Sequence, residues 1–154
     1  AIYGYTACFR ETNDSIFLNF AKDIANMIMD RVKTEDAIPY WDYDAPVTKE
    51  TPRDVSAASV TASAMIELST MVPDGQKYLD YAEKILKSLS SDAYLAKVGD
   101  NQGFILMHSV GSLPNGSEID TPLNYADYYY LEALKRFMEL KKLKVENGEL
   151  RVIQ

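Results

Sequence analysis

The octapeptide FLNFAKDI at residues 17–24 returns 61 residues later as YLDYAEKI at residues 78–85. Both copies carry aromatic residues at their first and fourth positions, and Leu, Ala and Ile at the second, fifth and eighth. This spacing places the apolar residues on one face of a helix. In each copy an apolar helix and a turn precede the amphipathic helix, and such a repeat is typical of stacked helical hairpins.

Working outward from the repeat, the apolar spacing and the cap residues predict an all-α chain. The helix starting at Ile16 follows Asp14 or Ser15 as its cap, and the next helix opens at Asp54 or Ser56. The last helix starts at Thr121-Pro122, because proline is tolerated in a first turn, and it forms the first half of a third unit. The predicted helices span residues 2–11, 16–32, 78–89, a short 91–97 and 121 to about 144, and one more helix opens at Asp54 or Ser56 and is followed by a turn at residues 73–75. Residues 146–154 form a tail with at most a short strand.

Two long connections of dissimilar composition interrupt these helices. Residues 34–52 contain three prolines and the run YWDYDAP, and residues 102–120 contain the only histidine of the chain, His108. Long irregular connections inside a compact domain are uncommon and are usually functional or disordered. The apolar start of the second connection argues against disorder. Because both connections fall on matching sides of the hairpins, we expect them to carry the site.

The composition excludes several classes of function. The 154 residues suggest one domain, and 16 basic against 23 acidic residues give a net charge of −7 without a basic stripe, which argues against nucleic acid. Cys8 is the single cysteine, so neither an internal disulfide nor a cysteine-based zinc site can form. We expect no metal and no cofactor, and no apolar run approaches the ~20 residues of a membrane span. The start AIYGY, without an initiator Met or a cap, suggests a piece of a longer protein.

Five motifs together resemble one family. They are YWDYDAP from Tyr40, TPRDVSAAS from Thr51, NQGF from Asn101, HSVGSLPNGSEID from His108 and YADYYYLEAL from Tyr125. In order and spacing they are similar to the C-terminal part of the catalytic domain of the bacterial unsaturated glucuronyl hydrolases, glycoside hydrolase family 88. The resemblance covers the chain except its tail. It implies that residues 1–154 form roughly the C-terminal half of a single (α/α)6 barrel.

The same resemblance implies an activity. Family members hydrate the double bond of a 4,5-unsaturated uronic acid at the end of lyase-generated oligosaccharides, with an aspartate as general acid and base. Because the family's catalytic aspartates lie in the N-terminal half, no catalytic residue is expected here. The expected partners are the unsaturated oligosaccharide and either the missing half of the barrel or a second copy. The alternatives are an unsaturated rhamnogalacturonyl hydrolase with the same barrel, and a non-catalytic helical-repeat interaction domain.

Site residues also carry over from the resemblance. The family's substrate-closing loop matches Gly111 and Ser112, and a Ser-x-x-Ser-x-Lys pattern that holds a sulfated sugar in some members reads Ser112, Asn115 and Ser117 here. The missing lysine favours an uncharged sugar or one sulfated elsewhere. The alternative for these residues is ordinary turn chemistry.

Several other residues have two interpretations each. Trp41 is either a sugar-stacking platform or a core residue. Asp42, Asp44 and Asp54 resemble an acid–base cluster, but helix capping or pairing with Arg53 is the preferred interpretation. His108 is interpreted as a structural histidine rather than a base, and residues 128–130 as helix packing.

Overall fold

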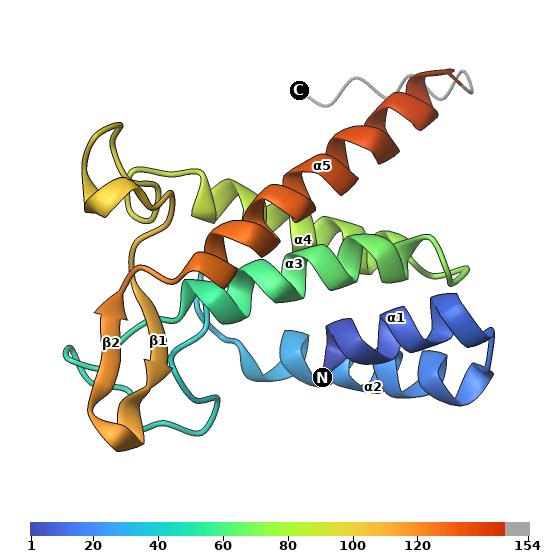
Figure 1. The fold of residues 1–154 in the computed structure, drawn as a ribbon. Coiled ribbons are helices and arrows are strands. Elements are labelled where there is room, and N and C mark those ends of the chain that lie inside the picture. The colour runs from blue at the N-terminus through green and yellow to red at the C-terminus, as the bar shows by residue number, and fades with distance from the viewer. Residues whose placement is uncertain (147–154) are drawn as a thin grey trace.

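The computed structural model describes the backbone of residues 1–146 and the side chains of residues 1–142. Within this range the chain is mainly helical, which confirms the predicted class (Figure 1). The helices are α1 (Ile2–Thr12), α2 (Ser15–Arg31), α3 (Val55–Ser69), α4 (Gln76–Leu89) and α5 (Asn124–Glu146). Two short strands, β1 (Ser109–Ser112) and β2 (Ser117–Thr121), and two single 3-10 turns lie between α4 and α5.

The sequence repeat corresponds to a repeat of hairpins. The two octapeptides begin at the third residue of α2 and of α4. Each of these helices packs against the helix before it, so that α1 pairs with α2 and α3 pairs with α4. Helices α1, α3 and α5 are successive neighbours, with α3 between the other two. The chain therefore builds two complete hairpins and the first helix of a third.

Helix α3 forms the centre of the core. It contacts α1, α4 and α5, and its buried positions include the small residues Ala58, Ser59, Ala62, Ser63 and Ala64. Small side chains let neighbouring helices approach closely, so α3 can be surrounded on several sides. Larger apolar side chains at its ends and on α4 fill the remaining space, namely Met65, Ile66, Leu68, Tyr78, Ile85 and Leu89.

The predicted caps are confirmed. Asp14 accepts a hydrogen bond from the Ile16 amide at 3.0 Å and Asp54 accepts one from the Ser56 amide at 3.0 Å, so each carboxylate satisfies a free N–H of a first helical turn. Between α3 and α4, a Cβ atom added to Gly75 would lie 1.9 Å from the Ser69 carbonyl oxygen. The tight turn between these helices therefore requires glycine.

Three local predictions were wrong. Residues 91–97 form turns and an isolated bridge between Leu95 and Leu106, not a helix. Only the first part of residues 102–120 is irregular, because β1 and β2 form an antiparallel hairpin from Ser109 onward, and no such sheet was expected. The last helix begins at Asn124, after Pro122. The only strand that the sequence analysis expected was a possible short one in the tail. The tail from residue 147 lies outside the described residues, so this expectation is not tested.

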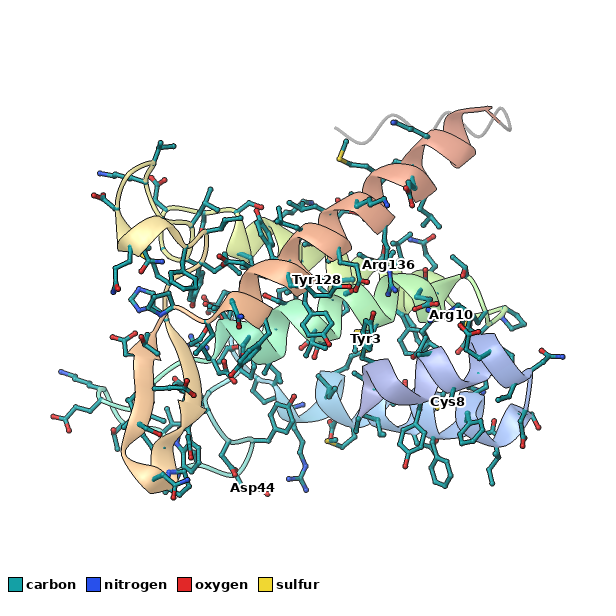
Figure 2. The ribbon with its side chains drawn as sticks, viewed as in Figure 1. Tyr3, Cys8, Arg10, Asp44, Tyr128 and Arg136 are labelled. Atoms are coloured by element: carbon teal, nitrogen blue, oxygen red, sulfur yellow. The ribbon has the colours of Figure 1, made fainter. Side chains whose placement is uncertain are left out.

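Charged and hydroxyl side chains connect α1, α3 and α5. Glu132 on α5 accepts hydrogen bonds from Tyr3 at 3.1 Å and from Ser63. Arg136, one turn further along α5, pairs with Glu67 at 2.9 Å, and Arg10 pairs with the same carboxylate at 2.6 Å. Figure 2 shows Tyr3 and Arg10 on α1 near Arg136 on α5. One ionic network thus ties all three neighbouring helices together.

The aromatic run of α5 serves packing, as predicted, for two of its three residues. Tyr129 meets Tyr3 edge to face at 5.0 Å, and the buried Tyr130 shares a hydrogen bond of 2.8 Å with Ser90. Tyr128 is 58% exposed. Among the described residues, no helix is long and apolar enough to cross a membrane.

Candidate functional site

The two long connections lie at one end of the molecule. Residues 32–54 lead into the N-terminus of α3, and residues 90–123 lead into the N-terminus of α5. Figure 1 shows the β1–β2 hairpin and the loop of residues 32–54 side by side at this end. The expectation that both fall on the same side of the helical hairpins is confirmed by this arrangement.

The hairpin carries four of the five predicted substrate-binding residues. Gly111 and Ser112 end β1, Ser117 starts β2 opposite Ser112, and Asn115 lies in the turn between them. Ser112 is half-buried and the other three are exposed. The Asn115 side-chain amide donates to the Ser112 hydroxyl oxygen at 2.8 Å, which leaves the Ser112 O–H free to donate to a ligand.

A β-bulge shapes the foot of the hairpin. Ser109 pairs with Thr121 and Val110 pairs with Ile119, so Asp120 is the extra residue on β2. Its φ of +51° turns the side chain toward His108, whose Nδ1 lies 2.6 Å from the Asp120 carboxylate. This hydrogen bond gives His108 a polar partner, and both side chains are exposed.

Backbone and capping groups anchor the hairpin to the helices. Asp54 Oδ1, besides capping α3, accepts from the Val110 amide at 3.3 Å, and the His108 carbonyl accepts from the Val55 amide at 3.1 Å. On the other side, Asp127 of α5 accepts from the amides of Ile105 and Leu106 at 2.8 and 2.9 Å. These anchors come from residues far away in sequence, and no local pattern identifies Asp127 as a partner of that loop.

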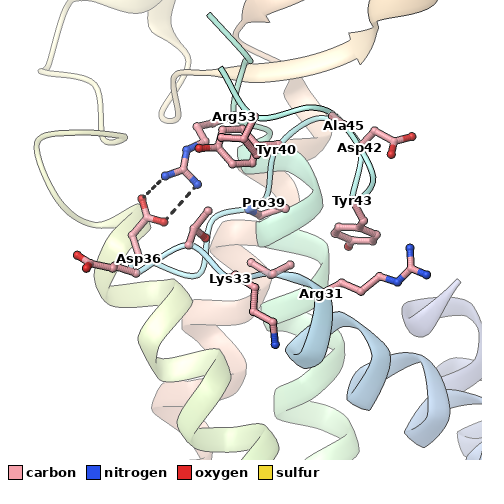
Figure 3. Close-up of a pocket in the computed structure, with 13 residues that line it drawn as sticks. Arg31, Lys33, Asp36, Pro39, Tyr40, Asp42, Tyr43, Ala45 and Arg53 are labelled. Atoms are coloured by element: carbon pink, nitrogen blue, oxygen red, sulfur yellow. Dashed lines mark hydrogen bonds and ion pairs between the residues drawn. The ribbon is translucent and has the colours of Figure 1, made fainter. Parts of the chain in front are cut away.

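Residues 32–54 enclose two adjoining clefts. The larger cleft has a volume of about 660 Å³ and is shown in Figure 3, and the smaller cleft has about 510 Å³. Both are lined by Arg31, Tyr40, Asp42 and Tyr43. Trp41, the fifth predicted substrate-binding residue, is half-buried and lines only the smaller cleft. The alternative of a fully buried core tryptophan is therefore wrong.

The three carboxylates singled out in this segment have partners within the chain, and only Asp54 has a role that the sequence predicted. Asp54 caps α3, Asp44 pairs with Arg31 at 2.6 Å, and Asp42 accepts from the Asp44 amide at 2.7 Å. The partner of Arg53 is Asp36, at 3.5 Å. Asp36 was not among the partners that the sequence predicted. Arg53 can reach Asp36 because the chain reverses direction between them, and an isolated antiparallel bridge joins Tyr40 to Arg53.

Asp36 is held in its charged form. Burial by itself raises the pKa of Asp36, but the Tyr94 hydroxyl at 2.6 Å, the Ile38 amide and the Arg53 guanidinium outweigh burial and lower that pKa below its usual value. Burial, followed by the hydrogen bond to Asp36, raises the pKa of Tyr94 to about 12. Tyr94 also meets the His108 ring edge to face at 6.3 Å, so it connects the cleft segment to the hairpin.

The polar groups at this end are hydroxyl and amide groups of the hairpin and carboxylates that already accept hydrogen bonds within the chain. In the described part of the chain, no three His, Cys, Asp or Glu side chains come together as metal ligands would. Hydroxyl and amide groups on the hairpin, and aromatic rings beside the clefts, suit hydroxyl-rich ligands. The one buried carboxylate at this end, Asp54, already accepts three hydrogen bonds.

Comparisons with known proteins give one matching family model and several relatives of the same name. The model of glycosyl hydrolase family 47 matches residues 1–142. An unsaturated glucuronyl hydrolase of Formosa agariphila is 45% identical over 141 residues, which are 91% of this chain and 35% of that protein. The enzyme of the same name from Bacillus sp. (strain GL1) is 32% identical over 88% of this chain and 36% of its own length. The chain thus spans about a third of the length of these curated relatives.

Solved structures agree with these relatives. The crystal structure of an unsaturated glucuronyl hydrolase specific for heparin superposes with a TM-score of 0.89 at 59% identity, over 92% of this chain and 38% of that one. A mutant enzyme from Streptococcus agalactiae, complexed with dGlcA-GalNAc6S, gives a TM-score of 0.81 at 30% identity, over 88% of this chain and 37% of that one. The matching family model carries the number 47, whereas the motifs suggested family 88. The relatives at 45% and 59% identity are both unsaturated glucuronyl hydrolases, so the chain is assigned to that group.

Proposed function

The chain belongs to the glycosyl hydrolases and, within them, to the unsaturated glucuronyl hydrolases, and from this premise we propose that its parent protein removes a 4,5-unsaturated uronic acid from lyase-generated oligosaccharides by hydrating the double bond. The observation that carries the proposal is the 59% identity and the TM-score of 0.89 to the heparin-specific enzyme. The names of the relatives favour this activity over a rhamnogalacturonyl hydrolase or a non-catalytic repeat domain.

In this proposal residues 1–154 form the C-terminal part of one (α/α)6 barrel and contribute binding rather than proton transfer. The hairpin residues Gly111, Ser112, Asn115 and Ser117 contact the sugar next to the unsaturated ring, and Trp41 packs against a sugar face. The free O–H of Ser112 and the exposed position of the hairpin support this role. The general acid and base are aspartates outside this chain.

The proposed substrate is an unsaturated disaccharide of the heparin type. The heparin-specific enzyme is 59% identical to this chain, whereas the unsaturated chondroitin disaccharide hydrolases of Streptococcus agalactiae and Streptococcus pneumoniae are 30% and 29% identical. The hairpin carries no lysine between Ser112 and Ser117. A sulfate that needs a cation at this place is therefore disfavoured, and sulfation elsewhere on the sugar is compatible.

The proposed macromolecular partner covers the outward face of α5. Tyr125, Tyr128, Leu131 and Met138 are each 40–58% exposed and recur at helical spacing. Several exposed large apolar side chains along one helix favour an interaction site. We assign it to the remaining part of the barrel or, without that part, to a second copy of the chain. Sedimentation of the 154-residue chain tests this, and a monomer at high concentration would contradict it.

The activity is tested with a protein extended upstream to the length of the relatives, beside the 154-residue chain. Both are mixed with unsaturated disaccharides from heparin, chondroitin and rhamnogalacturonan lyase digests, and loss of the absorbance of the unsaturated ring is followed. We expect turnover of the heparin disaccharide by the long protein and none by the short chain. Preference for the rhamnogalacturonan product would overturn the family assignment of the activity, and turnover by the short chain would show that it contains the acid and base.

A further inference from the structure

The larger cleft differs from the hairpin site in being a concave pocket and in lying against the end of helix α2. Its volume of about 660 Å³ is in the range of small-ligand pockets, roughly 300–1,000 Å³. The residues around it come from the end of α2 and from the segment that returns to α3, as Figure 3 shows. None of the hairpin residues lines it. The proposed function therefore leaves this cleft without a role.

The charges around the larger cleft balance. Arg31, Lys33 and Arg53 supply three cations, and Glu35, Asp36 and Asp42 supply three carboxylates. The cations already have carboxylate partners, because Arg31 pairs with Asp44 at 2.6 Å, Lys33 with Asp30 at 3.1 Å and Arg53 with Asp36 at 3.5 Å. A charged ligand would have to compete with these pairs, so the cleft favours a neutral one.

The remaining lining suits a ring with an apolar face and hydroxyl edges. Tyr40, Tyr43, Pro39 and Val47 give apolar and aromatic walls. A guanidinium group can only donate hydrogen bonds, and an ionised carboxylate can only accept them. A ligand that contacts both must therefore carry acceptors as well as donors. Sugar hydroxyl groups do both, and the C–H face of a sugar ring packs on aromatic surface.

The polar groups are fixed before any ligand arrives. The Arg53 guanidinium lies over the Tyr40 ring at 4.5 Å and donates to the Ile38 carbonyl, and Asp36 is held by Tyr94 and the Ile38 amide at 2.6 and 3.1 Å. A preorganised site loses less entropy when it binds. The larger cleft thus has the shape, the balanced donors and acceptors and the rigidity of a binding site.

We propose that the larger cleft binds neutral sugar units of an oligosaccharide, as a second carbohydrate site separate from the hairpin. It adjoins the smaller cleft, with which it shares Arg31, Tyr40, Asp42 and Tyr43, so a chain of sugars can extend from Trp41 outward. The inference goes beyond the proposed function, because binding in this cleft requires no turnover and can be tested without it.

The test is a titration of the 15N-labelled 154-residue chain with cellotetraose and chitotetraose, with a heparin tetrasaccharide as the anionic comparator. We expect one neutral tetrasaccharide to shift the amides of residues 33–36 and 40–47 with a Kd of about 1 mM, and the anionic one to bind these residues at least fivefold more weakly. Absence of shifts in residues 31–53 with both neutral probes at about 10 mM, or tighter binding of the heparin probe there, would overturn the proposal.

Variants locate the binding. Tyr40→Leu keeps an apolar side chain but removes the aromatic wall and should weaken binding about tenfold, as loss of an aromatic anchor typically does. Lys33→Ala, at a side chain 73% exposed and therefore tolerant of change, should weaken it two- to threefold by removing a donor. Tyr128→Leu, an aromatic control outside both clefts, should bind as the unchanged chain does. Unchanged binding in both cleft variants would contradict the assignment.

The source of the sugar is distinguished with the extended protein. If the cleft holds the far end of the substrate, an unsaturated tetrasaccharide should have a lower KM than the disaccharide, and Tyr40→Leu should remove that difference. If the cleft holds a separate glycan, the KM of the two substrates is equal while cellotetraose or chitotetraose still shifts the cleft amides. Both outcomes support the site, and loss of those shifts in the extended protein would refute it.

Discussion

The β1–β2 hairpin and the segment of residues 32–54 lie at the same end of the molecule but use their polar side chains in opposite ways. The hairpin presents exposed Asn115 and Ser117 at its turn, and a hydrogen bond between His108 and Asp120 lies at its foot. The segment pairs its charges internally and encloses two clefts. The hairpin, rich in Gly, Ser and Asn, therefore lines neither cleft. The clefts form beside residues 32–54, where the chain turns back and Tyr40 pairs with Arg53.

Asp54 joins the two regions, and its loss should have the largest effect. Asp54→Ala removes the cap of α3 and leaves the Val110 amide and the Ser56 hydroxyl without their shared acceptor. A lost cap costs about 1 kcal/mol and an unsatisfied buried donor about 1–3 kcal/mol, so the free energy of unfolding should fall by about 2–4 kcal/mol in urea titrations. The matched control, Asp14→Ala at the exposed cap of α2, should cost only about 1 kcal/mol. Equal losses would mean that Asp54 does not connect the regions.

Asp36 tests the internal pairing of the cleft segment through pH. Its pKa is lower in the folded chain than in the unfolded chain, so folding favours the ionised carboxylate. This contribution is present above the unfolded pKa of about 3.9 and is lost as the pH falls through the folded value. At pH 7, Asp36→Asn should lower the free energy of unfolding by about 1.5–3 kcal/mol, and this difference should shrink in acid.

The control for Asp36 is Asp44→Asn, which breaks an exposed pair with Arg31 and should cost less than about 1 kcal/mol at any pH. Urea titrations between pH 2.5 and pH 7 measure both variants. A difference for Asp36→Asn that stays constant over this range would show that its carboxylate is not the stabilising form.

On the hairpin, Ser112 should affect binding rather than stability. In the extended protein, Ser112→Ala should weaken substrate binding by roughly 0.5–1.5 kcal/mol, the value of a neutral hydrogen bond. The change should appear in KM with kcat unchanged, because the contact is made equally in the ground and transition states. Asn115→Lys, which adds a cation at the turn, should shift the preference toward sulfated substrates. Loss of kcat at constant KM in Ser112→Ala would mean that the hairpin takes part in the chemistry.

The pair between His108 and Asp120 should have the smallest effect. Both side chains are exposed, by 42% and 60%, so His108→Asn should change the free energy of unfolding by less than about 1 kcal/mol. Asparagine is chosen because the φ of +67° at this position suits it better than alanine. Hydrogen exchange of the Val110 and Ile119 amides should accelerate up to about fivefold.

Asp120→Asn removes the same interaction, so it should accelerate exchange at the same amides, and the double variant should add little. Unchanged exchange in both single variants would show that the bulge alone, and not the hydrogen bond between His108 and Asp120, holds the foot of the hairpin.

The helices could be predicted because their signals are local. The repeated octapeptides, the capping residues Asp14 and Asp54 and the apolar spacing identified every α-helix of the described chain within a few residues. The wrong predictions fell where tertiary contacts outweigh local preference. Residues 91–97 are drawn into a bridge with Leu106, and the Gly/Pro-rich stretch from Ser109 becomes a hairpin because Asp54 and Asp127 hold its flanks.

The sequence by itself determined the helical class, the order of the hairpins, the caps and the motifs that match the family, since each of these depends on residues within a few turns of one another. Only the tertiary structure decided which carboxylate meets Arg53, where Trp41 lies and that residues 32–54 enclose a cleft. Asp36 and Arg53 are 17 residues apart, and Ser63 and Glu132 are 69 apart. No local rule pairs such residues, because their distance depends on how the helices pack.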